Sequence, residues 1–370
     1  MSARVFIWVQ HLLGFGHFSR ARVVAEALRD AGFVVTLVSG GATPAEAVPQ
    51  GLAFVQLPVA RAKDELFDEL VDGDGNAVDQ RWHEARRDTL LAAFRAAKPD
   101  VLITETFPFG RRLLEFELLA LLDEAKRAQP RPVIVASVRD VLQRPRKDAR
   151  AAAMVARAEE SYDAVMVHGD PGIIRLEQSF AETAALAERC HYAGYICADV
   201  RPFEGERREV LVSAGGGAAG GGLIATALEA REHSRSKRMP WTFVTGPLGQ
   251  TLPAREGVTI VRSLPDFRAR LAAAAVSVSQ AGYNTVIETV KARTAAVVVP
   301  FETEREKEQL MRAEVFAKRG LVRLVRAEGL EPAALARAID ETARRVPPQT
   351  MIDVDGRGGV VRVIKALLSR

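Results

Sequence analysis

Short apolar runs rich in β-branched residues alternate with helical stretches, and this alternation constrains the fold more than any other feature of the sequence. In the first half the runs are bounded by turn residues, as expected of buried parallel strands, and they cover residues 5–9, 34–38, 101–104, 133–136 and 164–167. Helical patterns lie between them, for example residues 20–31, which end before Gly32, and residues 78–97. This order predicts βαβ units and a parallel sheet.

The same plan occurs a second time after residues 198–206, whose charge and Pro/Gly content indicate a linker. The second set of strands is predicted at residues 210–213, 241–245, 258–261, 275–279, 295–299 and 321–325, with helices such as 223–232 and 303–319 between them. The length of 370 residues also suits two α/β domains. We therefore predict one doubly wound domain over residues 1–200 and another over 201–370, with a final helix that can pack back on the first.

Composition and charge narrow the kinds of partner. Hydrophobic residues make up 48% of the chain and charged residues 26%, no signal-peptide pattern is visible, and no apolar run approaches the roughly 18 residues needed to span a bilayer. With only Cys190 and Cys197, neither a disulfide framework nor a zinc site is indicated. These features favour a soluble, cytoplasmic protein. Aromatic residues at 6% and the lack of a recognition motif argue against a nucleic-acid partner.

Positive charge is concentrated in the second half. Residues 1–200 carry a formal charge of −4 and residues 201–370 one of +8. A basic half suits an anionic ligand such as a nucleotide diphosphate, although a solvated basic surface explains it equally well. In the first half, a basic run could make at most a peripheral contact with anionic lipid or a phosphorylated substrate, a solvated helix start being the simpler interpretation; it comprises Arg139, Arg144, Arg146, Lys147 and Arg150.

The loop after the first predicted strand, residues 11–19, contains the best candidate for a general base. Gly14 and Gly16 permit close backbone approach, and Ser19 is a favoured N-cap residue for the next helix. His17, placed before that helix, could accept a proton from an attacking hydroxyl near neutral pH. The alternative is a histidine that only braces the turn.

A second loop, residues 214–222, consists entirely of Gly and Ala. The amides of Gly215, Gly216 and Gly217 could therefore approach phosphate oxygens at a helix N-terminus. The segment also matches GxGxxG, but the next strand ends in Gly246-Pro247 and lacks the acidic residue of a dinucleotide site. A flexible glycine-rich turn is the simpler alternative.

The most informative region begins at Ser279. Gly282 followed by Asn284 and Thr285 indicates a strand-to-helix turn with donors for a diphosphate, and the helix N-terminus would favour a departing nucleotide without a metal. One helical turn later, Glu288 could accept hydrogen bonds from both hydroxyls of a ribose. Further on, Glu308 and Gln309 could bind hydroxyls of a sugar. The alternative is an ordinary amphipathic helix with surface carboxylates. No metal site is predicted. The acidic turn at residues 72–76 is followed by Ala77 at the sixth position, where a calcium loop requires glycine.

Over residues 279–313 the Ser/Gly turn, the Glu, the Val-Pro strand end and a Glu-Gln pair followed by Ala occur in the order found in family 28 glycosyltransferases, which the chain resembles over nearly its whole length. The resemblance implies an α/β fold of the GT-B type, two doubly wound Rossmann-like domains facing a central cleft, and inverting, metal-independent transfer from a UDP-sugar with no cofactor. It also implies a role for each matching residue. Glu288 would bind the ribose, Glu308 and Gln309 the donor sugar, and Gly215–Gly217 the phosphates. Leu264 would lie beside the nucleotide base, and His17 takes the place of the family's N-terminal His.

The chain also departs from that pattern. Its first loop, His-Leu-Leu-Gly-Phe-Gly-His, differs from the Gly-Gly-Thr-Gly-Gly-His of the family member that adds N-acetylglucosamine to the peptidoglycan precursor, and its second loop lacks the Ser-Gln pair. The donor sugar and the acceptor, whether lipid-linked or a glycan, therefore remain unassigned. Segments such as residues 105–112 resemble a less characterised branch of predicted glycosyltransferases and are expected to line the acceptor side. Arg139, Asp140 and His168 follow strands and are expected on the acceptor side, structural pairing being the alternative for each.

Two other functions remain compatible with these residues. A nucleotide-sugar epimerase or hydrolase would use the same fold and donor but would release product without an acceptor. A non-catalytic sugar-nucleotide-binding protein would bind the donor tightly and turn nothing over.

Overall fold

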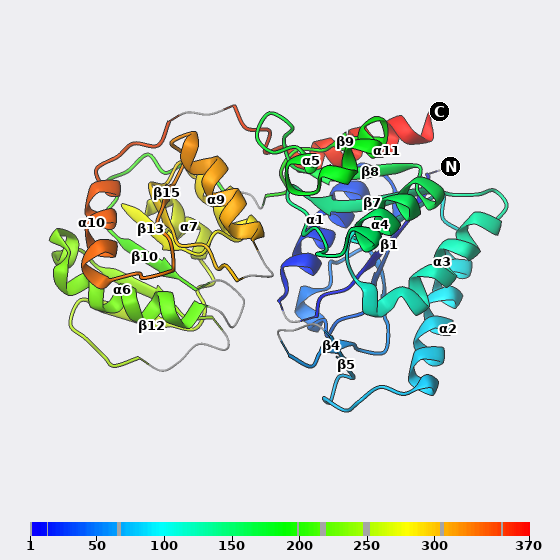
Figure 1. The fold of residues 1–370 in the computed structure, drawn as a ribbon, viewed down its shortest axis with the longest axis horizontal. Coiled ribbons are helices and arrows are strands. Elements are labelled where there is room, and N and C mark those ends of the chain that lie inside the picture. The colour runs from blue at the N-terminus through cyan, green and yellow to red at the C-terminus, as the bar shows by residue number, and fades with distance from the viewer. Residues whose placement is uncertain are drawn as a thin grey trace. The chain divides into compact units, whose positions relative to one another are not determined.

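The computed structural model describes residues 2–12, 14–64, 68–197, 200–214, 220–246, 252–303, 307–348 and 351–370. The chain divides into two compact units: unit 1 comprises residues 1–171, 175–196 and 355–370, and unit 2 comprises residues 172–174 and 197–354. The last helix, α11 (Gly356–Leu368), thus lies with unit 1, shown in red in Figure 1 beside the blue N-terminal elements. Both chain ends therefore belong to unit 1.

Unit 1 is built on a parallel sheet with the strand order β3-β2-β1-β6-β7-β8-β9. Its strands are β1 (Arg4–Val9), β2 (Val34–Ser39), β3 (Ala53–Gln56), β6 (Val101–Glu105), β7 (Val133–Arg139), β8 (Ala164–His168) and β9 (Cys190–Tyr192), and a small antiparallel pair is formed by β4 (Arg61–Ala62) and β5 (Leu70–Val71). The direction of winding reverses between β1 and β6, so the loops after these two strands flank the crevice where doubly wound sheets bind ligands.

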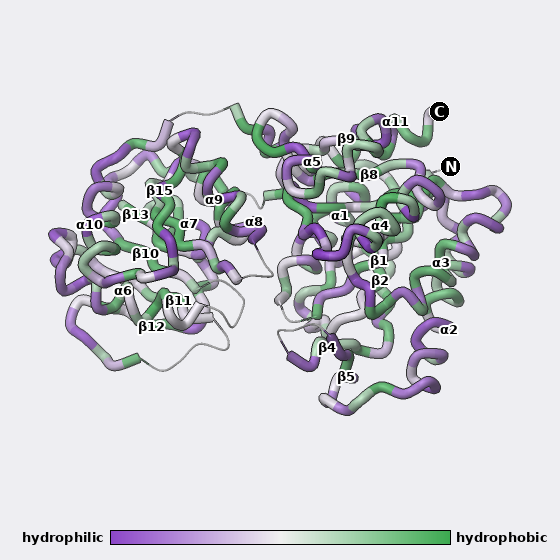
Figure 2. Tube along the Cα trace, viewed as in Figure 1, coloured by the Kyte–Doolittle hydropathy of each residue, from purple (hydrophilic) through white to green (hydrophobic). Residues whose placement is uncertain are grey.

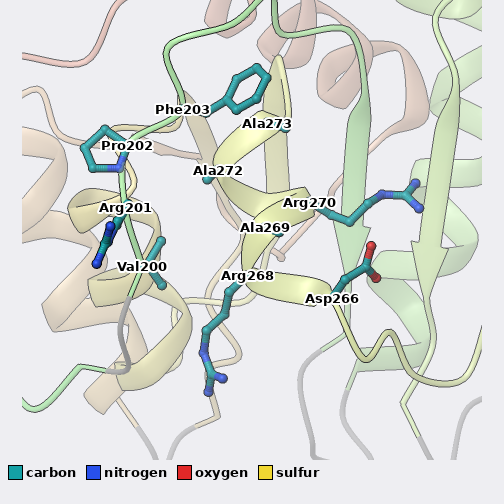
Figure 3. Close-up of a pocket in the computed structure, with 10 residues that line it drawn as sticks. All are labelled: Val200, Arg201, Pro202, Phe203, Asp266, Arg268, Ala269, Arg270, Ala272 and Ala273. Carbon is teal, nitrogen blue, oxygen red and sulfur yellow. The ribbon is translucent and has the colours of Figure 1, made fainter.

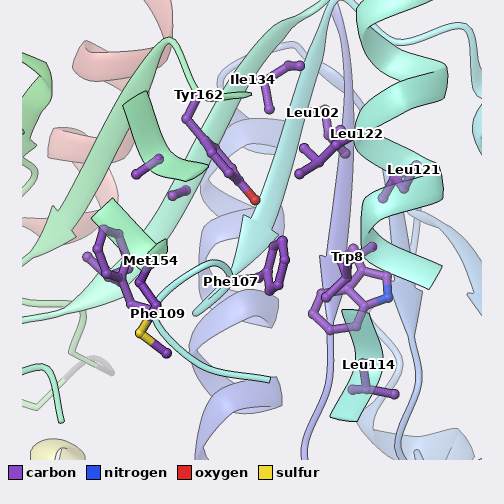
Figure 4. Close-up of a cluster of buried hydrophobic side chains, with 14 of the residues drawn as sticks. Trp8, Leu102, Phe107, Phe109, Leu114, Leu121, Leu122, Ile134, Met154 and Tyr162 are labelled. Carbon is purple, nitrogen blue, oxygen red and sulfur yellow. The ribbon is translucent and has the colours of Figure 1, made fainter. Parts of the chain in front are cut away.

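Helices cover both faces of this sheet. They are α1 (Gly16–Asp30), α2 (Gln80–Ala97), α3 (Glu115–Arg127), α4 (Asp148–Ser161), α5 (Leu176–Ser179) and α11, with 3-10 turns η1 (Ala45–Ala47), η2 (Arg112–Leu114) and η3 (Ala181–Arg189). One face packs a large apolar core that includes Trp8, Phe107 and Tyr162, as Figure 4 shows. The opposite face packs against α1 and α11. Burial on both faces explains why the central strands read as uninterrupted apolar runs.

Unit 2 repeats the plan with the strand order β12-β11-β10-β13-β14-β15, again parallel. Its elements are β10 (Val210–Ser213), α6 (Gly221–His233), η5 (Arg235–Arg238), β11 (Trp241–Val244), β12 (Val258–Val261), α7 (Phe267–Ala273), β13 (Val276–Ser279), α8 (Tyr283–Lys291), β14 (Ala296–Val298), α9 (Glu308–Lys318), β15 (Arg323–Leu324) and α10 (Pro332–Thr342). The strands are the most hydrophobic part of the unit, as in unit 1 (Figure 2). Here the winding reverses between β10 and β13, next to the predicted donor residues.

The α/β fold with two Rossmann-like sheets is as predicted from the alternation of apolar runs and helices, but the start of the first helix is not. Ser19 was expected at the N-cap, whereas α1 begins at Gly16 and its N-cap residue is Phe15. The Ser19 N–H already bonds to the Phe15 carbonyl at 3.0 Å, so helical hydrogen bonding begins a turn earlier than the cap preference indicated. His17 therefore lies inside the first turn of α1.

The helices, the cysteines and the metal-ligating side chains of the described part of the chain bear on its possible partners. None of its helices is both long enough and apolar enough to cross a bilayer. Cys190 and Cys197 are free thiols. Within these residues, no three His, Cys, Asp or Glu side chains gather as a metal ion would require.

A close helix-to-backbone contact holds α11 on unit 1. A Cβ added to Gly359 would lie 1.7 Å from the Ala193 carbonyl oxygen. Although alanine favours helix, Gly359→Ala is expected to lower the free energy of unfolding by about 1–3 kcal/mol, because the helix must move away from this backbone. Denaturation in urea measures the change. Arg362→Ala, on the exposed side of α11, serves as the control, and equal stability of the two variants would refute the contact.

Candidate functional site

In unit 1 the candidate site lies at the reversal of the sheet. His17 is in the first turn of α1, directly after β1, and Glu105 is the last residue of the neighbouring strand β6. Parallel pairing brings the carboxyl ends of these strands to the same edge, which places the two side chains in contact although 88 residues separate them. The position agrees with the rule that ligands of doubly wound sheets bind at this point.

His17 and Glu105 form a tightly connected pair. The His17 Nδ1 lies 2.9 Å and 3.0 Å from the two carboxylate oxygens of Glu105. Glu105 is only 1% exposed and also accepts hydrogen bonds from Arg20 and, at 2.8 Å, from the Thr106 hydroxyl. Because an ionised carboxylate only accepts, Nδ1 carries the proton and the Nε2 lone pair is left available as a base.

The charges around the pair set its protonation. Burial alone would raise the pKa of Glu105, but its interactions with His17, Arg20 and Arg111 hold it below its ordinary value. Burial lowers the pKa of His17 to about 3, an effect that Glu105 opposes and that Arg111 and Arg139 reinforce. At neutral pH Glu105 is therefore ionised and His17 is neutral, which is the state required of a general base.

This arrangement can take a proton from a hydroxyl group. When Nε2 accepts the proton, the imidazolium that forms is stabilised by the adjacent Glu105 carboxylate, as a buried carboxylate does in acyl-transfer enzymes. Thr106 has φ +69°, a left-handed conformation that costs a non-glycine residue energy and that occurs mainly where the surrounding structure enforces it. The backbone directly after Glu105 is thus held in a strained form at the candidate site.

The other predicted residues of unit 1 are placed at the same edge of the sheet but make mainly structural contacts. His168, the last residue of β8, is fully buried, and its Nε2 lies 2.7 Å from the Ser137 hydroxyl. The buried Asp140 accepts a hydrogen bond from the Val141 N–H at 3.0 Å. Arg139 ends β7 and is half-buried, and its charge acts on His17. Their acceptor-side role stays a prediction.

The sequence predicted only that residues 105–112, which include Glu105 and Arg111, line the acceptor side, and it gave no individual role to Glu105, Arg20 or Arg111. A signal for Glu105 existed, because a carboxylate at the end of an apolar run next to the first strand is placed at the crevice of such a sheet. The partnership of Arg20 with Glu105 could not be read, since it joins α1 to β6 across 85 residues. Gly14 and Gly16 do flank the start of α1, and open space surrounds a Cβ built on Gly14.

In unit 2 the predicted donor residues gather around the start of α8. Gly282 is the N-cap residue, and Asn284 and Thr285 lie half-buried in the first turn, where backbone N–H groups are unpaired by the helix itself. Ser279, buried, ends the preceding strand β13. Glu288 lies one turn into the helix, where its side chain is mostly buried and receives a hydrogen bond from Arg268 Nε at 3.0 Å.

Glu308 and Gln309 begin α9 and are anchored to neighbouring loops. The Gln309 Oε1 accepts from the Phe301 N–H at 3.0 Å, which leaves its amide N–H donors available for a ligand. Glu308 accepts from the buried Arg312 at 2.8 Å. Arg312 also donates to the Ala281 carbonyl at 3.2 Å and lies over the Tyr283 ring. One buried arginine therefore links the start of α9 to the start of α8.

Two other donor contacts were predicted, one with the phosphates and one with the nucleotide base. Gly215, Gly216 and Gly217 lie outside the described residues, so their contact with phosphates stays a prediction. Leu264 follows β12 and is half-buried against the small apolar cluster of Leu211, Leu271 and Ala274. Its proposed place beside a base is compatible with that position, because the residue follows the carboxyl end of a strand.

A pocket of about 630 Å³ lies along α7 in unit 2. Figure 3 shows α7 forming one wall and residues 200–203 the other, with Phe203 and Arg268 at opposite ends of the view. Arg268 is the partner of Glu288, and Arg270 donates to Thr242 at 2.8 Å and pairs with Glu209. The pocket therefore borders the candidate donor residues on the side of α7.

Residues 248–353 match the glycosyltransferase family 28 C-terminal domain. This segment contains the predicted donor residues from Leu264 to Gln309 and lies within unit 2. No curated protein matches this sequence.

Solved structures similar to this chain include three glycosyltransferases. A glycosyltransferase of kitacinnamycin superposes with a TM-score of 0.65 at 17% identity, covering 99% of this chain and 96% of that one. CalG4, the calicheamicin glycosyltransferase, gives 0.62 at 18%, covering 100% and 95%. MurG of Acinetobacter baumannii gives 0.59 at 14%, covering 100% of both. The whole chain thus has the GT-B fold of these proteins, and residues 248–353 match the C-terminal domain of glycosyltransferase family 28.

Proposed function

We propose that this chain transfers a sugar from a UDP-sugar to an acceptor hydroxyl, with inversion at the anomeric carbon and without a metal ion. The observation that carries the proposal is the hydrogen bond from His17 Nδ1 to the buried Glu105, which leaves Nε2 as an oriented, neutral base. A single displacement at the anomeric carbon requires a general base that removes the proton of the acceptor hydroxyl. Uridine as the base of the donor rests on the family 28 match.

The reaction balances with these groups. The acceptor oxygen attacks the anomeric carbon as its proton passes to His17 Nε2, and the bond from that carbon to the donor phosphate oxygen breaks. Nucleotide diphosphate leaves with the electron pair of the broken bond. Glu105 stabilises the imidazolium, and the proton is released to solvent after the products have left.

Unit 2 supplies the groups proposed to bind the donor. The backbone N–H groups in the first turn of α8, which have no partner within the helix, offer partial positive charge to the departing diphosphate, which a metal ion would otherwise neutralise. The Glu288 carboxylate has the acceptor capacity to bind both ribose hydroxyls while it also pairs with the exposed Arg268. The Gln309 amide is available for a hydroxyl of the sugar.

The binding of a nucleotide diphosphate tests the proposed donor site in unit 2. Uridine diphosphate at 100 times its dissociation constant, in the presence of EDTA, is expected to stabilise the protein by about 2.7 kcal/mol. Glu288→Gln should weaken that binding by roughly tenfold or more, because each hydrogen bond to a charged group contributes about 1.5–3 kcal/mol. Thermal unfolding with a panel of nucleotide diphosphates measures both effects.

The control is Glu229→Gln, an exposed glutamate on α6, which should bind as the wild type does. Stabilisation by ADP or GDP equal to that by UDP would contradict the uridine assignment, and a strict requirement for a divalent cation would contradict metal independence. Release of UDP from the donor at the same rate with and without acceptors would instead identify a hydrolase.

A further inference from the structure

Arg111 is a buried arginine beside the candidate base, and the reaction described above does not use it. It directly precedes η2 and has φ +63°, a left-handed conformation unusual for a residue with a side chain. Its side chain is 11% exposed, and its Nε and Nη2 atoms are buried without a hydrogen-bond partner in the described structure. The nearest carboxylate oxygen, Glu105 Oε2, lies 3.9 Å from Nη2, which is too far for a hydrogen bond.

Glu105 cannot balance this charge because it is already committed to other donors. Its carboxylate accepts hydrogen bonds from His17, Arg20 and Thr106. Arg139 lies close enough for its charge to act on both His17 and Arg111. Within the described residues, the Nε and Nη2 atoms of Arg111 therefore have no carboxylate oxygen within hydrogen-bond distance.

The free-energy cost of burying these donors without partners favours a binding role for Arg111. Burial lowers the pKa of Arg111 to about 10; Glu105 opposes this shift, and Arg139 and Arg20 add to it. Arg111 thus remains cationic at neutral pH. A buried donor without a partner costs about 1–3 kcal/mol, and more when it is charged, so such groups are rare outside functional sites. A guanidinium offers parallel N–H donors that match the oxygens of a phosphate or carboxylate.

We propose that Arg111 binds an anionic group of the acceptor, a phosphate or a carboxylate, carried next to the hydroxyl that receives the sugar. The proposal rests on the proposed function, because it takes His17 as the base that marks the position of that hydroxyl. The distances of 3.9 Å from Arg111 to Glu105 and 3.0 Å from Glu105 to His17 place Arg111 in the same cluster of side chains as the base.

A bound anion would also change the base itself. Arg111 and Arg139 reduce the proton affinity of His17, so an anion that neutralises them increases that affinity. His17 then becomes a stronger base when an acceptor with the matching charge is present. An acceptor without the anionic group would meet a weaker base and would leave Arg111 unpaired, which penalises its binding.

Inorganic phosphate tests the subsite without knowledge of the acceptor. Phosphate is titrated at constant ionic strength into the full chain carrying ¹⁵N-labelled histidine, and the ring signals of His17 are assigned by their loss in His17→Gln. The wild type should show a saturable shift of these signals. Arg111→Met should bind phosphate at least tenfold more weakly, whereas Arg111→Lys, which keeps the charge, should retain part of the effect.

Arg112→Met is the matched control, because Arg112 is the next residue and is exposed. Its response to phosphate should equal that of the wild type. A wild type without a saturable shift, or an Arg111→Met variant that responds equally, would overturn the proposal. Circular dichroism and thermal unfolding show whether each variant is folded.

The diphosphate of the donor is the other anionic group that Arg111 could bind. A second titration distinguishes it from the anionic group of the acceptor. With UDP at saturation, phosphate should still shift the His17 signals if the anion belongs to the acceptor. If UDP itself produces the Arg111-dependent shift and abolishes that of phosphate, the acceptor assignment is wrong. None of these titrations requires turnover, so a failure of the proposed transferase reaction, seen as unchanged activity in His17→Gln, is recorded separately.

Discussion

Replacing His17 by glutamine is expected to lower kcat for sugar transfer by about 10²–10⁴-fold, the usual contribution of a positioned general base. The amide of glutamine has no lone pair basic enough to take the acceptor proton, while most of the contacts around the loop are retained. The measurement is the initial rate of UDP release in the presence of the acceptor. Stabilisation by UDP should be unchanged, which separates loss of chemistry from loss of donor binding.

Two further results would support the same role. Glu105→Gln should reduce kcat by roughly 10²–10⁴-fold as well, because an amide can neither stabilise the imidazolium nor enforce the Nδ1–H tautomer. Since the pKa of His17 is lowered to about 3, the base stays unprotonated on acidification, and kcat/KM of the wild type should not fall between pH 7 and pH 5. A His17→Gln variant with wild-type kcat would show that His17 only braces the turn.

The largest effect on stability is expected at Arg86. This residue and Glu117 are fully buried in unit 1 and form an ion pair with each other. Arg86 also donates to the carbonyls of Gly40 and Pro58 and to the Gln10 side chain, and Trp8 donates to Glu117 at 3.1 Å. Every member is satisfied, and Arg86→Ala would leave Glu117 as a buried, unpaired charge.

Arg86→Ala is therefore expected to lower the free energy of unfolding of unit 1 by about 3–5 kcal/mol. Hydrogen exchange measured by mass spectrometry reports this change at β1 and β6, and the strands of unit 2 provide an internal reference. Arg87→Ala, at the adjacent exposed position, should change it by less than about 0.5 kcal/mol. Removing both charges with Arg86→Met and Glu117→Leu should recover much of the loss, and equal protection in Arg86→Ala and Arg87→Ala would contradict the argument.

Much of the fold could be predicted because its signals are local. The central strands β1, β6, β10 and β13 are rich in β-branched and other apolar residues and are buried on both faces, and this sequence pattern does not depend on which strand lies beside them. The edge strands β3 and β9 were not predicted, since they are short and only partly buried. The start of α1 was placed too late because Ser19 is a good N-cap residue, whereas helical hydrogen bonding already begins at Phe15.

The candidate site was predictable where its residues are neighbours in the chain. Gly282, Asn284, Thr285 and Glu288 fall on one strand-to-helix turn, so their spacing alone places them together. The clusters that join distant segments were not predictable. Arg312 connects α9 to the loop before α8 across 31 residues, and only the packing of those helices on the sheet brings it there.

Two doubly wound α/β units, the place of His17 beside the first helix and the place of the predicted donor residues at the start of the helix after β13 could all be predicted from local sequence patterns. These are consequences of side-chain periodicity and of short-range backbone geometry. The contacts of Glu105 with His17 and Arg20, and the burial of Arg111 beside them without hydrogen-bond partners for its Nε and Nη2 atoms, could be seen only in the folded chain. The parallel strands β1 and β6 are neighbours in the sheet, but their paired residues, such as Val5 and Val101, are 96 residues apart in the chain, so their pairing leaves no pattern in the local sequence.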